Sequence, residues 1–141
     1  MDDQSVHNEK RSRVMRAIRS RDTRLELTFR KALWGRGLKG YRVSPRHILG
    51  QPDVTYPSLQ LAIFVDSCFW HGCPDHCRRP SSNVGYWHAK IDRNIERDKG
   101  VAASLCAQGW IVLRIWEHDL TDRLPDTVER IAEVINDLRA N

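Results

Sequence analysis

The ten residues from Cys68 to Cys77 hold three cysteines, two histidines and two large aromatic side chains. Thiolate and imidazole together suit zinc, and a closed structural zinc site needs four such ligands. Cys68, Cys73 and His76 would supply three of them, and a fourth must come from elsewhere. The ligand spacing is irregular for a zinc finger, so we expect the metal to brace this loop rather than to organise a separate fold.

Two carboxylates precede this segment in the chain. Asp53 follows Pro52 at the start of an expected strand, and Asp66 ends the apolar run of the next strand. Two such oxygens close together can hold Mg²⁺, which polarises a phosphodiester and activates water. The pattern resembles that of the PD-(D/E)xK nucleases, named for their Pro-Asp…Asp/Glu-x-Lys motif. The motif's lysine is missing, and His71 could take over as the base because a neutral imidazole can accept a proton.

The charge balance favours a polyanionic partner. The chain of 141 residues carries a net charge of +5, and arginines and lysines crowd its N-terminal segment and the segment after Cys77. Nucleic acid is the simplest such partner, although a solvated basic face explains the charge about as well. No apolar run reaches membrane-spanning length. We therefore expect a cytoplasmic protein, associated with the nucleoid when it acts, with free or metal-bound thiols rather than disulfides.

Hydrophobic periodicity predicts one α/β domain. Residues 1–10 read as a flexible tail, and residues 11–141 read as the domain. The expected elements alternate as helix, strands, helix, strand and helix, which predicts an αβα sandwich around a mixed sheet. The expected helices cover 12–19, 23–35, 85–107 and 125–138, and the expected strands cover 41–43, 53–56, 59–65 and 110–116, the last covered on both faces.

Taken together, these segments resemble the Vsr family, the very-short-patch-repair endonucleases that nick DNA beside T:G mismatches. The resemblance covers nearly the whole chain in the right order. It is carried by Met15-Arg16-Ala17-Ile18, Arg21-Asp22-Thr23 with Glu26, Gly50-x-Pro52-Asp53, Phe64-Val65-Asp66-x-Cys68-Phe69-Trp70-His71-Gly72-Cys73-Pro74, Trp87-x-x-Lys90-Ile91-x-x-Asn94 with Arg97-Asp98, Gly109-Trp110 and Trp116-Glu117-His118. It implies a restriction-endonuclease-like fold.

The resemblance also implies catalytic roles. Asp53 would bind Mg²⁺ together with the backbone carbonyl of Val65, and His71 would be the general base or orient the water. Glu26 and Asp98 would hold water in the outer shell of the metal. Asp66 stands where the best-known member has a histidine, and a carboxylate there could add a direct metal ligand. As plain alternatives, Glu26 could cap a helix and Asp98 could be a surface charge.

By family position, His118 would be the fourth zinc ligand, with Cys77 as its competitor. Cys106 lies in an expected apolar helix stripe and is most simply a core residue.

The resemblance further implies how DNA would be contacted. The rings of Phe69, Trp70 and Trp87 would wedge between base pairs beside the mispair, where unstacking costs least. Other contacts would come from Met15 and Ile18 in the minor groove and from Lys90, Asn94 and Arg97 on the phosphates. Helix docking explains Met15 and Ile18 almost equally well, and the last three could be solvated polar residues.

The expected function is Mg²⁺-dependent nicking of one strand 5′ of the thymine in a T:G mispair, with structural zinc. A Vsr-like nicking or restriction enzyme with another substrate is the first alternative. The second is a zinc-stabilised DNA-binding module, which would need neither Asp53 nor His71. The expected partners are double-stranded DNA and either mismatch-repair proteins or a cytosine methyltransferase. We expect a monomer with no membrane contact.

Overall fold

A mixed four-stranded sheet forms the centre of the computed structural model, which describes residues 24–68, 73 and 82–140. The strand order is β1-β2-β3-β4, with antiparallel pairing from β1 to β3 and parallel pairing between β3 and β4. The strands are β1 (Arg42–Val43), β2 (Val54–Tyr56), β3 (Leu61–Asp66) and β4 (Ile111–Trp116). The fold is therefore the expected α/β class with a mixed sheet and flanking helices.

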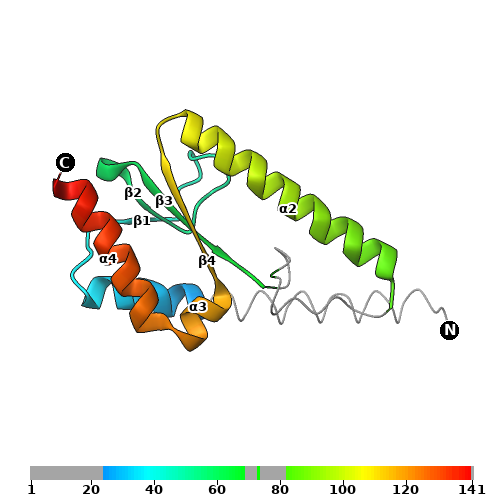
Figure 1. Cartoon of the computed structure of the whole chain (residues 1–141), viewed down its shortest axis with the longest axis horizontal. Helices are drawn as coiled ribbons and strands as arrows, with labels where there is room; N and C mark the ends of the chain where they lie inside the picture. Colours follow the sequence, from blue (N-terminus) through cyan, green and yellow to red (C-terminus); the bar gives the residue numbers. More distant parts are fainter. Residues whose placement is uncertain (1–23, 69–72, 74–81, 141) are drawn as a thin grey trace.

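Helices cover both faces of this sheet (Figure 1). Helix α2 (Val84–Ala107) packs on one face, where Leu105 joins Ala62 and Phe64 of β3. The helix over residues 24–35 and α4 (Leu124–Ala140) pack on the other face, against Leu61 and Ile63. The short helix α3 (Glu117–Asp122) joins β4 to α4. In the described residues, no helix is long and apolar enough to cross a membrane.

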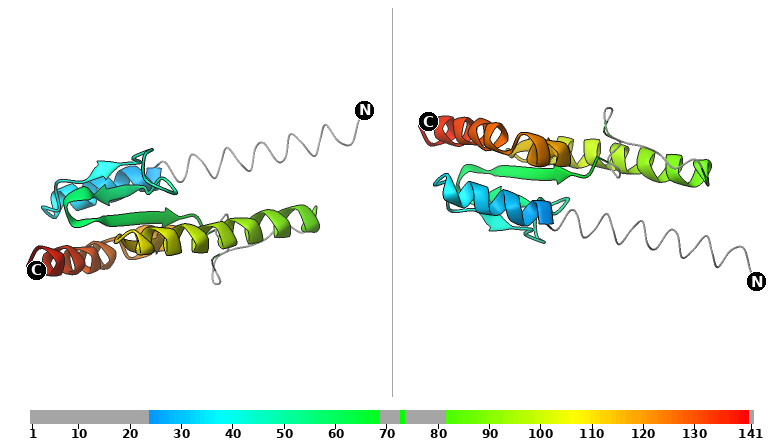
Figure 2. Two further views of the ribbon diagram at one scale, coloured as in Figure 1. Left: turned by 90° about the horizontal axis from the view of Figure 1, so that it is seen from above. Right: turned by 90° about the horizontal axis from the view of Figure 1, so that it is seen from below.

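Two further views show where the first helix and α2 lie. In Figure 2 the helix over residues 24–35, in blue, lies beside the cyan segment that contains β1, and α2 runs along the opposite side of the sheet. Strand β3 lies in the interior of the sheet, with five of its six residues buried. The chain enters and leaves this buried strand at Gln60 and Asp66, so residues at its carboxyl end are held by a rigid support.

Most expected elements are confirmed within one or two residues. The β2–β3 hairpin has a wider turn than expected, because Pro57–Leu59 forms a 3₁₀ helix and Gln60 adopts a left-handed conformation with φ of 51°. Helix α3 was not expected, since six residues between a strand and a longer helix carry little periodic signal. The tail over residues 1–10, the basic helix over 12–19 and the cap at Thr23 lie outside the described residues.

Two expectations about burial are wrong. Strand β4 is only half-buried, with Ile111 exposed, because it forms the edge of the described sheet rather than its middle. Cys106 is exposed rather than part of the core. Its neighbour Leu105 points into the core, and one residue is about 100° of turn in an α-helix. The apolar stripe of α2 therefore passes beside Cys106.

Gly50 allows the loop before β2 to approach α2. It has a φ of 76°, and a Cβ at this position would collide with the side chain of Val101 and lie 3.4 Å from the ring of Phe64. A side chain here is therefore opposed both by backbone conformation and by space. This close approach fixes the loop that leads to Asp53 and β2 against α2 and Phe64.

We predict that Gly50→Ala lowers the free energy of unfolding by about 2 kcal/mol or more, because it combines a strained φ with overpacking. The matched control is Gly100→Ala in α2, where an added Cβ meets nothing within 4 Å. In a helix interior that change should stabilise by about 0.5–1 kcal/mol. Urea denaturation of both variants measures the difference, and equal effects would contradict this account of the loop.

Candidate active site

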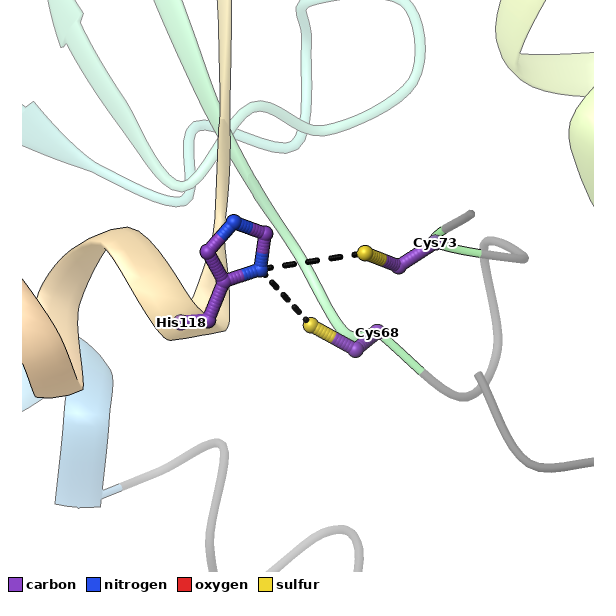
Figure 3. A group of neighbouring side chains, drawn as sticks. All are labelled: Cys68, Cys73 and His118. Atoms are coloured by element: carbon purple, nitrogen blue, oxygen red, sulfur yellow. Dashed lines mark hydrogen bonds between the residues drawn. The ribbon is translucent and has the colours of Figure 1, made fainter. Parts of the chain in front are cut away.

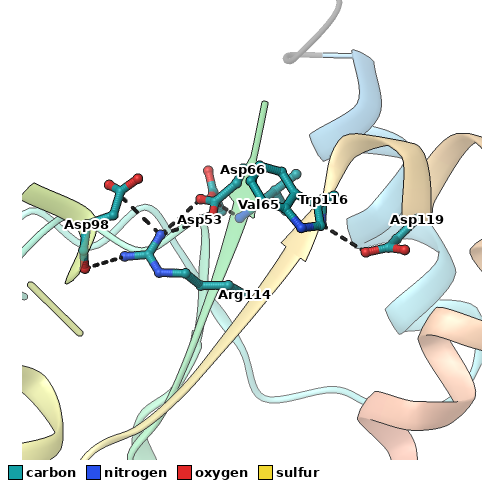
Figure 4. Close-up of polar contacts among 7 residues, drawn as sticks. All are labelled: Asp53, Val65, Asp66, Asp98, Arg114, Trp116 and Asp119. Atoms are coloured by element: carbon teal, nitrogen blue, oxygen red, sulfur yellow. Dashed lines mark hydrogen bonds and ion pairs between the residues drawn. The ribbon is translucent and has the colours of Figure 1, made fainter. Parts of the chain in front are cut away.

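Asp53 lies immediately before β2, and its carboxylate is turned toward the carboxyl end of β3. Its Oδ2 accepts a hydrogen bond of 2.6 Å from the backbone N–H of Val65 (Figure 4). The pKa of Asp53 is raised to about 8, mainly by burial and then by the hydrogen bond with Glu26 and the charges of Glu26 and Asp66, while the hydrogen bond from the Val65 N–H lowers it. Three carboxyl groups from three elements therefore converge. Such a group needs either protons or a cation.

Asp66, the last residue of β3, is held by a cation from β4. Arg114 donates from Nη1 to both Asp66 oxygens, at 2.9 and 3.2 Å, and from Nη2 to the carbonyl oxygen of Asp98 at 3.2 Å. The Asp98 carboxylate lies 4.0 Å from the same Nη1. Figure 4 shows the guanidinium between the two aspartates. Asp66 and Asp98, which are 32 positions apart in the chain, thus share one arginine.

A second group lies just beyond the end of β3. The ligand atoms of Cys68, Cys73 and His118 all lie within 4.8 Å of one another. The Nδ1 of His118 is 3.3 Å from the sulfur of Cys68 and 3.7 Å from that of Cys73 (Figure 3). In a tetrahedral zinc site, bond lengths of about 2.0–2.3 Å put neighbouring ligand atoms about 3.3–3.8 Å apart. The donor types and their spacing therefore fit a metal ion such as zinc.

The backbone and neighbouring carboxylates hold this group in place. The N–H of Cys73 donates to the carbonyl of Cys68 at 3.0 Å, and the N–H of Cys68 donates to Oε1 of Glu117 at 3.0 Å. Asp119 lies 3.6 Å from Nε2 of His118, on the side of the ring away from the sulfurs. This distance is longer than a hydrogen bond, but a carboxylate near Nε2 favours a proton on that nitrogen, which leaves Nδ1 available to a metal. His118 is therefore oriented toward the two cysteines.

The pKa of the Cys68 thiol is raised to about 12, mainly by burial and also by the nearby Glu117 and Cys73, while the hydrogen bond with His118 lowers it. Without a cation, these surroundings disfavour a thiolate. A bound metal ion would reverse that balance, because thiolate is the form that coordinates.

Comparison with known proteins decides the family. The family model described as DNA mismatch endonuclease Vsr matches residues 3–79, more than half of the chain. The type II nicking enzyme V.NaeI of Lentzea aerocolonigenes is 41% identical over 136 residues, covering 93% of this chain and 80% of that protein. The chain belongs to the Vsr family. It is a nicking DNA endonuclease of that family.

Other relatives are named either as type II nicking enzymes or as a mismatch endonuclease. The type II nicking enzyme V.NmeDIP of Neisseria meningitidis serogroup C is 37% identical, covering 92% of this chain and 88% of that protein. The DNA mismatch endonuclease Vsr of Escherichia coli is also 37% identical, covering 87% of this chain and 79% of that protein. The relatives of this chain therefore include enzymes named for nicking and one named for mismatches.

The structure brings together many of the residues expected to form the Vsr site. Asp53, Val65, Asp66 and Glu26 meet at the carboxyl end of β3, with Asp98 joined through Arg114. Cys68, Cys73 and His118 also meet. The expected base His71, the zinc ligand His76 and its competitor Cys77 lie outside the described residues. So do Met15, Ile18, Phe69 and Trp70.

Helix α2 carries the remaining expected DNA contacts. Arg97 is exposed and donates to Oδ1 of Asn94 at 2.8 Å, and Lys90 lies 5.7 Å from the centre of the Tyr86 ring. These polar groups are accessible from solvent, as phosphate contacts must be. Trp87, in contrast, is only 4% exposed and packs edge-on against Tyr86. Packing accounts for Trp87 here, and it would have to be uncovered to stack on a base.

Three site residues were missed from the sequence: Arg114, Glu117 and Asp119. The sequence does contain a sign that Arg114 is special, because it is the one charged residue of an otherwise apolar strand. Glu117 and Asp119 flank His118 in the chain, but their contacts depend on the turn from β4 into α3. That turn was not predicted, so neither were the contacts.

We predict that the metal-free protein becomes less stable as the pH rises from about 4 to 8, and that Asp53→Asn removes much of this slope. The pKa of Asp53 is about 8 in the folded chain against an ordinary value of 3.8. A raised pKa contributes stability at low pH that is lost as pH rises through the folded value. Chelator-treated Asp53→Asn should be more stable at pH 8 by on the order of 2 kcal/mol.

The measurement is urea denaturation at pH 5 and pH 8. The matched control is Asp126→Asn, in the exposed first turn of α4, which should leave the pH slope as it is in the wild type. A wild-type slope in Asp53→Asn would show that Asp53 is ionised without a metal.

Proposed function

We propose that this Vsr-family enzyme cuts one strand of duplex DNA by Mg²⁺-dependent hydrolysis at the carboxyl end of β3. The observation that carries the proposal is the half-buried carboxylate of Asp53, which Glu26 and the charge of Asp66 make costly to ionise without a cation. Magnesium prefers such oxygens and, when bound, polarises a phosphodiester and lowers the pKa of water. Binding of DNA alone would not require this costly arrangement.

We propose a separate catalytic role for each of these residues. Asp53 and the carbonyl of Val65 would hold the ion, while Glu26 and Asp98 would orient its outer water molecules. His71 would accept the proton from the attacking water, since imidazole can take a proton near neutral pH. The Asp53 oxygen that accepts from the Val65 N–H keeps the carboxylate in a fixed orientation. Catalysis by positioning requires such fixed geometry.

The relatives bear on the choice of substrate. Several are named type II nicking enzymes, among them the one at 41% identity, and these favour a site-directed nicking enzyme whose preference differs from that of the E. coli mismatch enzyme. A T:G mispair, cut 5′ of the thymine, is the second candidate, favoured by the match to the family model and by E. coli Vsr.

Duplex DNA would lie across the end of β3 and along α2. Lys90, Asn94 and Arg97 are spaced to contact phosphates from one face of that helix. Phe69 and Trp70 would enter the base stack, with Met15 and Ile18 approaching from the minor groove. We further propose that the enzyme acts as a monomer. If T:G mispairs are its substrate, its partners would be mismatch-repair proteins or a cytosine methyltransferase.

The first experiment compares duplexes that differ at one base pair. With Mg²⁺, the wild type should nick one strand, and Asp53→Asn should lower the rate at least about a thousandfold, or about 4 kcal/mol, while still binding DNA. Equal nicking of T:G and T:A duplexes in every tested context would assign the chain to the nicking enzymes, and strong preference for T:G would assign it to mismatch repair. Normal nicking by Asp53→Asn would disprove the metal site.

We also propose that the second group binds structural zinc through Cys68, Cys73, His76 and His118. Its support is the convergence of two buried sulfurs and one imidazole nitrogen, with the orienting carboxylate of Asp119 behind it. Zinc at this position would fix the loop that carries His71 relative to the carboxylates. Cys77 remains the competing fourth ligand.

We predict that His118→Ala loses most of its zinc, from about one ion per chain, and about 3 kcal/mol or more of unfolding free energy. The control is His47→Ala, an exposed histidine outside the group, which should keep its zinc. Elemental analysis and thermal denaturation measure both effects. Full zinc content in His118→Ala, together with zinc loss in Cys77→Ala, would favour Cys77 instead.

A further inference from the structure

Arg114 is a charged residue in the middle of an apolar strand. Strand β4 reads Ile-Val-Leu-Arg-Ile-Trp, and the Arg114 side chain is only 24% exposed. Its partner in the parallel register is Phe64 of β3, and its guanidinium carbon lies 4.3 Å from the centre of that ring. A cation so placed is costly unless it is paired. The residues that pair with Arg114 therefore indicate its role.

Those partners are two carboxylate residues expected to serve the metal. Side chains alternate along a strand, so Arg114 faces the same side of the sheet as Phe64 and Asp66. Its Nη1 contacts both oxygens of Asp66, whose side chain is 7% exposed, and its Nη2 contacts the backbone of Asp98. Arg114 thus ties the end of β3 to the middle of α2.

We propose that Arg114 is a positioning residue of the metal site, which holds Asp66 out of direct metal coordination and leaves Asp53 as the carboxylate that binds the ion. This inference rests on the proposed metal-dependent cleavage. The sequence has Cys68 where the nuclease motif expects lysine, and Arg114 places a cation beside the same carboxylates from the neighbouring strand. Arginine does not lose its proton in proteins, so its contribution is charge and geometry rather than proton transfer.

Loss of the Arg114 charge should change the metal affinity of the site in one direction. Asp53, Glu26 and Asp66 are close enough for their charges to interact, and Arg114 offsets one of the negative charges. Removing the arginine would take this positive charge away from Asp66 and would make the site more negative, which attracts a divalent ion. The variant should therefore bind metal more tightly, whereas general damage to the fold would weaken binding.

The test is calorimetric titration of the full-length protein with Mn²⁺ in the absence of DNA. In Arg114→Met, the Kd for Mn²⁺ should fall at least about fivefold relative to the wild type, because one opposing charge is removed close to the ion. At saturating Mg²⁺, kcat for nicking should fall about tenfold, since Asp66 and Asp98 are no longer held. The KM for DNA should stay within about threefold, because no phosphate contact is removed.

Asp66→Asn/Arg114→Met provides the paired variant. It lacks both charges of the ion pair, so its Mn²⁺ affinity should return to within about twofold of the wild type. It also decides the question if Arg114→Met fails to fold, because replacing both partners of a buried pair is better tolerated than removing one. Arg114→Lys keeps the charge and should keep Mn²⁺ affinity near the wild-type value.

The matched control is Arg36→Met, which breaks the ion pair between Arg36 and Glu129 in the helical layer on the opposite face from α2. It should change neither Mn²⁺ affinity nor nicking by more than about twofold, as expected for an exposed pair. Unchanged or weaker Mn²⁺ binding in folded Arg114→Met would overturn the proposal. A raised KM for DNA with unchanged Mn²⁺ binding would assign Arg114 to DNA contact and would overturn it too.

The two proposals can fail separately. If the wild type nicks none of the duplexes, the proposed function fails, but the Mn²⁺ titrations still decide whether Arg114 controls the metal site. If nicking occurs and the titrations show no tighter binding in Arg114→Met, only the role of Arg114 falls.

Discussion

The parallel pairing of β3 with β4 is the constraint on which both functional groups depend. Its register runs from Leu61 opposite Ile111 to Asp66 opposite Trp116, so both strands end at the same edge. The residues just beyond those ends, Cys68 and His118, are 50 positions apart in the chain and meet at 3.3 Å. A shift of the register by one residue would turn Arg114 away from Asp66, because side chains alternate between the faces. One pairing therefore sets the geometry of the carboxylates and of the cysteine–histidine group.

The site is costly to the fold, and the surrounding structure stabilises it. Asp66 is buried and Asp53 is half-buried, and a carboxylate withdrawn from water lowers stability unless it is protonated, paired or bound to a cation. Arg114 pairs with Asp66, and the Val65 N–H contacts Asp53. A fully satisfied core would be more stable but could not bind an ion. The proposed Mg²⁺ ion would offset the unfavourable charge that remains.

The sequence predicted the elements and the chemistry of single residues better than it predicted their contacts. Periodicity predicts the bounds of α2 and α4 within a few residues, and the cysteines and histidines of the Cys68–Cys77 segment predict a metal-binding site. The pairing of Asp66 with Arg114 depends on strand register, which periodicity does not specify. The orientation of His118 by Asp119 depends on α3, a helix too short to show a pattern. Cys106 shows the same limit, since one residue of rotation decides whether a helix position is buried.

The most direct measurement is anomalous X-ray diffraction from crystals soaked in Mn²⁺, recorded at the manganese and zinc edges. We expect a manganese peak coordinated by the carboxylate of Asp53, with Asp66 still paired to Arg114, and a separate zinc peak between Cys68, Cys73 and His118. A manganese ion coordinated directly by Asp66, or no manganese beside Asp53, would contradict the account.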